Sequence, residues 1–161
     1  MNNPTISSET ELIRLPKSKV TCSACEANSA SQASKPVVIM CCEGGCSRGE
    51  IARRAANLLC LKIAPEKTVR LCLGGAFTKD TGQRKLARYA KRLIAIEGCF
   101  IKCGTRMMMG VIPGLNPEVV DATDHYELEA MPFGIDGLSE KDADLCATKV
   151  ADYVASLLRP S

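Results

Sequence analysis

The sequence has few aromatic residues and little charge imbalance. Its 161 residues include no tryptophan, only 4% aromatic side chains, one histidine and a formal net charge of +3. Nucleic acid recognition relies on basic surfaces and on aromatic side chains that stack on bases. We therefore expect no nucleic acid partner, and we interpret the basic residues of 82–92, GQRKLARYAKR, as the exposed face of a helix.

Long apolar runs are also missing. No stretch approaches the roughly 18 apolar residues of a membrane span, and the polar N-terminus has no apolar segment of the kind found in secretory signals. These absences predict a cytoplasmic protein with no membrane partner. Because the cytosol keeps thiols reduced, the ten cysteines indicate metal binding, redox chemistry or catalysis rather than a disulfide framework.

Short apolar runs alternate with helical patterns along most of the chain. Apolar runs begin at Val37, Val69 and Leu93, and residues 125–131, HYELEAM, are expected to form a fourth strand. Helical patterns occur at residues 49–64, 81–92, 99–110 and 139–158. This alternation predicts an α/β fold, a three-layer sandwich with a mostly parallel sheet of about four strands. Ser139 is the expected N-cap of the last helix.

Residues 1–35 have a different composition from the rest. They are rich in Ser, Asn, Lys and Ala and have almost no apolar periodicity, so we interpret them as a flexible N-terminal tail before a single α/β domain at 36–161. The tail contains Cys22 and Cys25, a CxxC pair typical of metal knuckles and of redox motifs. No second pair follows at zinc-finger spacing, so both interpretations stay open.

Five cysteines lie where three predicted strands end, and we call them the edge cysteines. They are Cys42, Cys46, Cys72, Cys99 and Cys103. In a parallel sheet the ligand crevice lies beyond the carboxyl ends of the strands. Neighbouring strands are about 4.8 Å apart, close to the roughly 3.8 Å between thiolates that share one zinc ion. The edge cysteines therefore predict a thiolate metal site, with Cys99 and Cys103 on one face at the start of a helix.

Three other cysteines have a structural interpretation. Cys60 and Cys146 fall at core positions of helical patterns, and Cys41 precedes Cys42 in a strand, so its side chain points to the opposite face. The lone histidine, His125, is expected to be packed or exposed rather than to bind a metal.

Two segments together resemble a known family. Residues 42–59, CEGGCSRGEIARRAANLL, are followed by Cys72 and then by IEGCFIKC at 96–103. This order is similar to that of the DGC-domain family, whose members are regarded as zinc-binding. In that family a cysteine–glycine loop leads into a helix, a further cysteine follows, and a strand ends in Asp-Gly-Cys with another cysteine shortly after.

The resemblance implies a metal-chelating set and a role for Gly49 at the helix entry. The implied ligands are Cys42, Cys72, Cys99 and Cys103. Glu97 stands in place of the aspartate in the family motif, and Glu43 in place of a serine. Cys46 is an extra thiol that is able to replace one of the four ligands or to act as a transfer partner.

A different interpretation makes the protein a thiol-dependent enzyme. Residues 42–48, CEGGCSR, resemble the anion loop of low-molecular-weight phosphatases and arsenate reductases. Cys42 would attack as a thiolate, while Arg48 and backbone N–H groups would hold an oxyanion. Asp121 and Asp124 are the candidates for the acid that protonates the leaving group.

For the metal site, zinc is the favoured ion because an all-sulfur tetrahedral set suits it, and an iron–sulfur cluster is the alternative. A site at the functional side of the sheet suggests sensing, transfer or thiol-redox chemistry. The sequence identifies neither a substrate nor a protein partner.

Overall fold

The computed structural model describes residues 10–159 except 12, 17 and 129–132. Its four strands form one parallel sheet in the order β2-β1-β3-β4. The strands are β1 Val37–Cys41, β2 Thr68–Arg70, β3 Arg92–Glu97 and β4 Glu118–Asp121. The α-helices are α1 Ser23–Gln32, α2 Ser47–Leu58, α3 Leu73–Thr78, α4 Gly82–Arg88, α5 Cys103–Val111 and α6 Glu140–Ser156. A π-helical turn, Leu59–Ile63, extends α2, and two 3-10 turns span Ala122–His125 and Ile135–Gly137.

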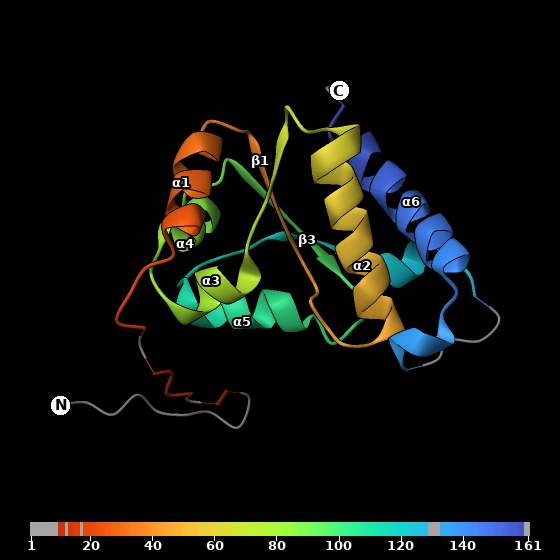
Figure 1. Cartoon of the computed structure of the whole chain (residues 1–161), viewed down its shortest axis with the longest axis horizontal. Coiled ribbons are helices and arrows are strands. Elements are labelled where there is room, and N and C mark those ends of the chain that lie inside the picture. The colour runs from red at the N-terminus through yellow and green to blue at the C-terminus, as the bar shows by residue number, and fades with distance from the viewer. Residues whose placement is uncertain (1–9, 12, 17, 129–132, 160–161) are drawn as a thin grey trace.

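Helices cover both faces of the sheet. Figure 1 shows α2 and α6 side by side on one face, with α1, α3, α4 and α5 grouped on the other. Each face has its own apolar cluster of buried residues. The predicted three-layer α/β sandwich is therefore confirmed.

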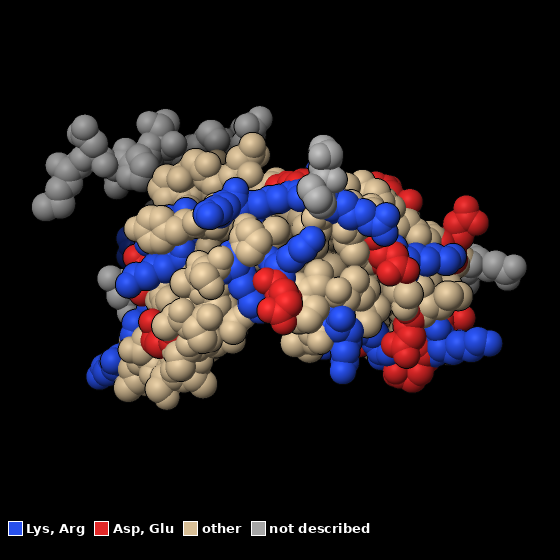
Figure 2. All heavy atoms as spheres, turned by 90° about the horizontal axis from the view of Figure 1, so that it is seen from above, with Lys and Arg blue, Asp and Glu red and all other residues tan. Residues whose placement is uncertain are grey.

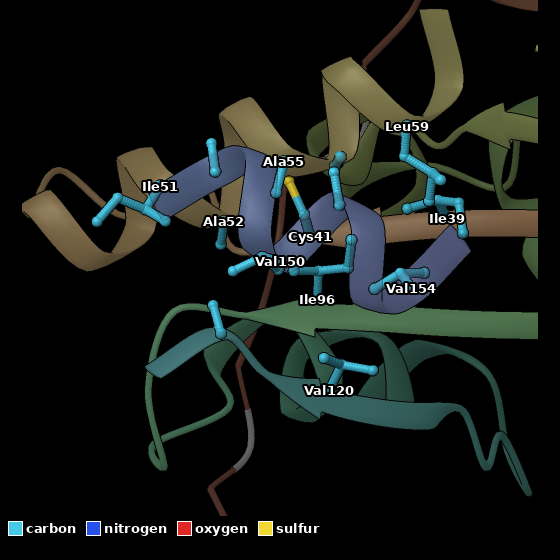
Figure 3. Packing of buried hydrophobic residues seen from close by; sticks show 14 of the residues in the cluster. Ile39, Cys41, Ile51, Ala52, Ala55, Leu59, Ile96, Val120, Val150 and Val154 are labelled. Carbon is cyan, nitrogen blue, oxygen red and sulfur yellow. The ribbon is translucent and has the colours of Figure 1, made fainter. Parts of the chain in front are cut away.

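The central strand β1 supplies side chains to both clusters. Ile39 and Cys41 face α2 and α6, while Val38 and Met40 face the opposite layer. Figure 3 shows Ile39 and Cys41 beneath the two helices, together with Val150 of α6. A strand buried on both faces reads as a continuous apolar run, which is why VVIMC was recognisable in the sequence.

The fourth strand lies earlier in the chain than expected. β4 is Glu118–Asp121 and pairs with β3, with Ile96 opposite Val120. Residues 125–131 were predicted to be this strand, but residues 122–125 form a 3-10 turn, residues 126–128 belong to no helix or strand, and 129–131 lie outside the described residues. The alternating polar and apolar residues of HYEL therefore do not reflect strand pairing.

Part of the expected tail is folded. Helix α1 lies against α4, where both carboxylate oxygens of Glu26 accept hydrogen bonds from the N–H of Gly82 at 2.9 and 3.1 Å. Ser29 is buried at the same contact. The prediction of a flexible tail does not hold for Ser23–Gln32, because this helix is attached by polar contacts that leave no apolar periodicity in the sequence.

The last helix begins as predicted. Ser139 Oγ accepts a hydrogen bond from the N–H of Asp142 at 3.1 Å, so Ser139 caps α6. Arg54 of α2 forms ion pairs with Glu140 and Asp144 of α6, and these pairs hold the two helices together at their exposed margin.

The surface carries charges of both signs. On the face in Figure 2, Asp and Glu side chains lie among the Lys and Arg side chains. No helix in the described part of the chain has the length and apolar character needed to cross a membrane.

The cysteine-lined carboxyl edge of the sheet

The strand order places the switch point of the sheet at the carboxyl ends of β1 and β3. The chain leaves β1 through α2 on one face of the sheet and leaves β3 through α5 on the other. The two following loops diverge at this point, which is where parallel α/β sheets bind ligands. One loop runs through residues 42–46 and the other through residues 98–102. These loops contain three of the edge cysteines.

Cys42 is held by backbone groups at the end of β1. Its N–H donates to the carbonyl of Ile96 at 2.9 Å, which extends the β1–β3 pairing by one residue. Its Sγ accepts a hydrogen bond from the N–H of Gly44 at 3.4 Å. Burial raises the pKa of the Cys42 thiol, and the N–H groups of Gly44 and Gly98 act in the opposite direction. Cys42 is therefore a buried thiol with two amide donors directed at its sulfur.

Cys46 caps helix α2 with its sulfur, which accepts the N–H of Gly49 at 3.4 Å. The loop folds tightly here, since a Cβ on Gly49 would lie 2.6 Å from the carbonyl oxygen of Gly44. Both Cys42 Sγ and Cys46 Sγ lie near Gly44, at 3.2 and 3.8 Å from the position of a Cβ added there. The loop thus places two thiols around one glycine, and Gly49 occupies the helix entry that the family resemblance implied.

The end of β3 supplies a buried carboxylate. Glu97 is 1% exposed, and its Oε1 accepts hydrogen bonds from the N–H and the hydroxyl of Thr105 at 2.6 and 2.7 Å. The charge of Glu97 contributes to the raised pKa of Cys42. Sequence reasoning noted Glu97 only as the counterpart of a family aspartate and missed its bond to α5.

The first turn of α5 lies close to the end of β1 and to the start of α3. A Cβ on Gly104 would be 3.4 Å from the side chain of Leu73 and 3.5 Å from the carbonyl oxygen of Cys41. These three residues directly neighbour Cys103, Cys72 and Cys42 in sequence. These contacts bring the end of β1 and the starts of α3 and α5 to one place.

The start of α5 differs from the prediction. Lys102 has φ 54° and ψ 48°, a left-handed conformation that interrupts the helix, and its N–H donates to the carbonyl of Cys99 at 3.1 Å. The helix begins at Cys103, so Cys99 lies in a preceding turn. The expectation that both residues share one helical face is therefore wrong. Cys99 is half-buried, and Cys103 and Cys72 are exposed.

Two buried polar atoms have no hydrogen-bond partner among the described residues. They are Glu97 Oε2 and Tyr126 Oη. Burial raises the pKa of Tyr126, and the charges of Cys146 and Arg48 act on it in opposite directions. Tyr126 packs in the same buried cluster as Cys42, and the charge of Glu97 acts on Cys42. Buried polar groups are normally paired, so two unpaired ones in the surroundings of Cys42 are unusual. Nothing in the sequence pattern pointed to Tyr126.

The cysteines assigned to the core are buried as predicted. Cys41, Cys60 and Cys146 are 0%, 5% and 3% exposed. His125 stacks on the ring of Tyr153, with 3.8 Å between the ring centroids, so it is packed as expected. Asp121 accepts hydrogen bonds from the N–H and hydroxyl of Thr123 and caps the following turn.

The edge cysteines are not gathered into one ligand shell. Among the described residues, no three His, Cys, Asp or Glu side chains are arranged to hold a metal ion. The ligand set therefore stays a prediction.

These features define a parallel α/β domain whose carboxyl edge is lined with cysteines and a buried carboxylate. The chain belongs to the DGC-domain family, because the family model for the DGC domain matches residues 38–127. None of the curated proteins and none of the solved structures gives a significant match. The matched segment begins in β1 and includes all five edge cysteines, while Cys22 and Cys25 lie outside it.

Proposed function

We propose that this protein binds a zinc ion through thiolates of the edge cysteines. The observation that carries the proposal is the environment of Cys42. Two backbone N–H groups donate to its sulfur, and the charge of Glu97 acts on the Cys42 thiol. Amide donors stabilise a thiolate once a cation has displaced its proton, and such groups commonly orient metal ligands.

The donor chemistry suits a thiophilic cation. Five thiols at one side of the sheet offer more sulfur than a tetrahedral zinc site requires, and a four-cysteine set favours zinc. Glu97 Oε2, which has no hydrogen-bond partner in the described part of the chain, is a further candidate ligand atom. The DGC set, Cys42, Cys72, Cys99 and Cys103, is the expected ligand group, with Cys46 as the exchanging thiol. An iron–sulfur cluster satisfies the same residues.

The location of the site supports a role beyond stabilising a loop. Ligands at this side of a parallel sheet sit where the helices begin and where loops move most easily. A set in which Cys46 exchanges with another ligand leaves a coordination position open, which a closed four-cysteine site does not. We therefore favour metal sensing, metal transfer or metal-restrained thiol chemistry in the cytoplasm.

The phosphatase-like alternative is less well supported by the loop geometry. An anion loop needs free backbone N–H groups around the attacking cysteine. Here the N–H of Gly49 donates to Cys46 Sγ and the N–H of Ser47 to the carbonyl of Phe133 at 3.1 Å, so neither group is free to hold an anion. Burial also raises the pKa of Cys42, which opposes thiolate formation at neutral pH.

The test is elemental analysis of protein purified without oxygen and without a metal-affinity tag. We expect about one zinc per chain and no visible absorption. A brown protein that absorbs near 400 nm would replace zinc by an iron–sulfur cluster. Each edge cysteine is then changed to serine, and Cys42→Ser, Cys72→Ser, Cys99→Ser and Cys103→Ser should each reduce the metal content.

Cys60→Ala and Cys146→Ala serve as matched controls, because both thiols are buried in the core away from the sheet edge. Circular dichroism confirms that each variant is folded. Equal metal loss in the controls, or full metal content in all four serine variants, would overturn the assignment.

A further inference from the structure

The CxxC pair outside the matched family segment sits at the start of helix α1. Cys22 is the N-cap of α1, and its carbonyl accepts the N–H of Glu26 at 3.1 Å. Cys25 is the third residue of the helix. One helical turn therefore carries both thiols, with Cys22 exposed and Cys25 half-buried.

This turn is packed against the rest of the domain. Glu26, next to Cys25, accepts the N–H of Gly82 at the start of α4. A Cβ on Gly82 would lie 2.6 Å from Cβ of Ser29, so the two helices are in close contact. Figure 1 shows α1 beside α4 and near α3, the helix that begins after Cys72.

Gln83 connects the CxxC pair to Cys72. Its Oε1 accepts the N–H of Cys72 at 2.9 Å, and its Nε2 donates to the carbonyl of Cys25 at 3.2 Å and to Ser29 Oγ at 2.8 Å. Gln83 is only 2% exposed. One buried amide thus holds the backbone of Cys25 close to the backbone of Cys72.

The two thiols of the pair differ in exposure, Cys22 being exposed and Cys25 half-buried. Backbone N–H of Cys25, followed by its side chain, lowers the pKa of Cys22. An exposed thiol that a substrate disulfide can reach, one helical turn from a half-buried second thiol, is the arrangement needed for thiol–disulfide exchange.

We propose that Cys22 and Cys25 form a dithiol centre that reduces small disulfides, and that Cys72 accepts the resulting protein disulfide. The Cys22 thiolate attacks one sulfur of the substrate disulfide, whose S–S bond breaks and releases one thiolate. Cys25 then loses its proton to solvent and attacks Cys22 Sγ, which expels the second substrate thiolate and leaves a Cys22–Cys25 disulfide. The substrate gains two electrons, and the dithiol loses two.

The second step moves the disulfide inward without further oxidation. Cys72, as its thiolate, attacks Cys25 Sγ and displaces Cys22 as a thiolate. The product is a Cys25–Cys72 disulfide with Cys22 free again. Because Cys72 is also an edge cysteine, this step transfers the disulfide from the start of α1 to one of the edge cysteines.

The experiment uses the reduced full-length chain and oxidised glutathione as the probe. After acid quenching and alkylation, peptide mass spectrometry should find both the Cys22–Cys25 and the Cys25–Cys72 disulfides. Cys22→Ser should slow glutathione release by about tenfold or more, since it removes the exposed thiol that attacks the substrate. Cys25→Ser should accumulate one glutathionyl group on Cys22, and Cys72→Ser should stop at Cys22–Cys25.

A positioning variant tests the role of Gln83. Gln83→Leu keeps the volume of the side chain but removes the bridge, so the Cys25–Cys72 product should fall several-fold while Cys22–Cys25 still forms. Gln32→Leu, at the other end of α1, is the control and should leave both products unchanged. Unaltered kinetics in Cys22→Ser, or equal glutathionylation of several other cysteines in Cys25→Ser, would overturn the proposal. Cys22→Ser and Cys25→Ser retain every edge cysteine, so a failure of metal binding does not affect this result.

Discussion

Glu97 and Thr105 join the end of β3 to the first turn of α5. Glu97 Oε1 accepts both the N–H and the hydroxyl of Thr105, and both side chains are buried. A carboxylate at this position is also stabilised by the dipole of the helix. The pair therefore fixes the turn that contains Cys99 relative to the helix that begins at Cys103.

Thr105→Val should weaken this connection. Valine keeps the shape of threonine but removes the hydroxyl donor, and a hydrogen bond to a charged group typically contributes about 1.5–3 kcal/mol. We expect the free energy of unfolding in urea to fall by that amount. Thr148→Val is the matched control, because its hydroxyl donates to the carbonyl of Asp144 on the exposed surface of α6. A change below about 0.5 kcal/mol is expected there. Similar losses in the two variants would contradict the role given to Glu97.

Gly49→Ala should distort the loop between β1 and α2. The added Cβ would lie 2.6 Å from the carbonyl oxygen of Gly44, a backbone atom that moves only with the whole loop. Overpacking of this kind costs about 1–3 kcal/mol. The unfolding free energy should fall accordingly, and zinc affinity should fall with it, because Cys42 and Cys46 lie on the same loop.

Gly110→Ala is the control for this change. A Cβ at Gly110 meets nothing within 4 Å, and the residue lies near the end of α5. Replacing an exposed helical glycine by alanine stabilises by up to about 1 kcal/mol. A Gly49→Ala protein as stable as wild type would show that the loop adapts, against the expectation.

The buried thiol of Cys41 should make the protein less stable in alkali. Burial raises the pKa of Cys41 far above its ordinary value, so the thiol keeps its proton in the folded state but ionises in the unfolded state above about pH 8.5. The unfolded state then binds fewer protons, and stability falls as the pH rises.

The measurement compares wild type and Cys41→Ala in urea from pH 7 to 10 with a reductant present. Cys41→Ala loses packing at every pH, but it has no thiol to ionise at this position. The stability advantage of wild type should therefore shrink steadily above about pH 8.5. An advantage that stays constant across the range would argue against the burial effect.

Apolar patterning was enough to predict most of the fold. The runs at Val37, Val69 and Leu93 became β1, β2 and β3, and Ser139 caps α6 as expected. β4 was misplaced because it is only four residues long and two of them are acidic. α1 was missed because Glu26 and Ser29, rather than an apolar stripe, attach it to α4.

The site was predictable only in outline. The positions of cysteines after strands can be read from the sequence, because strand ends in a parallel sheet share one side. Which thiols meet depends on polar contacts without periodicity. Gln83 lies in a segment interpreted as an exposed basic helix, yet it is buried and joins Cys25 to Cys72. The left-handed Lys102 likewise separates Cys99 from its expected helix.

Tyr126→Phe separates a purely structural role from a role at the metal site. Within the described part of the chain, the buried Oη of Tyr126 has no hydrogen-bond partner. An unsatisfied buried hydroxyl costs about 1–3 kcal/mol, so its removal should leave the metal-free protein as stable as wild type or more stable. Tyr153→Phe is the control, since that side chain is 39% exposed, and it should change stability by less than about 0.5 kcal/mol.

Zinc titration of the same variants, followed by competition with a chelator, measures whether Tyr126 contributes to zinc affinity. Tyr126 packs in the same buried cluster as Cys42, so its hydroxyl is a candidate to orient a ligand of an ion bound at this edge of the sheet. We expect Tyr126→Phe to weaken zinc binding by about tenfold, the loss typical of an outer-shell partner, while its metal-free stability is kept. A destabilised metal-free variant would mean that Oη already has a partner, and unchanged zinc affinity would place Tyr126 outside the metal site.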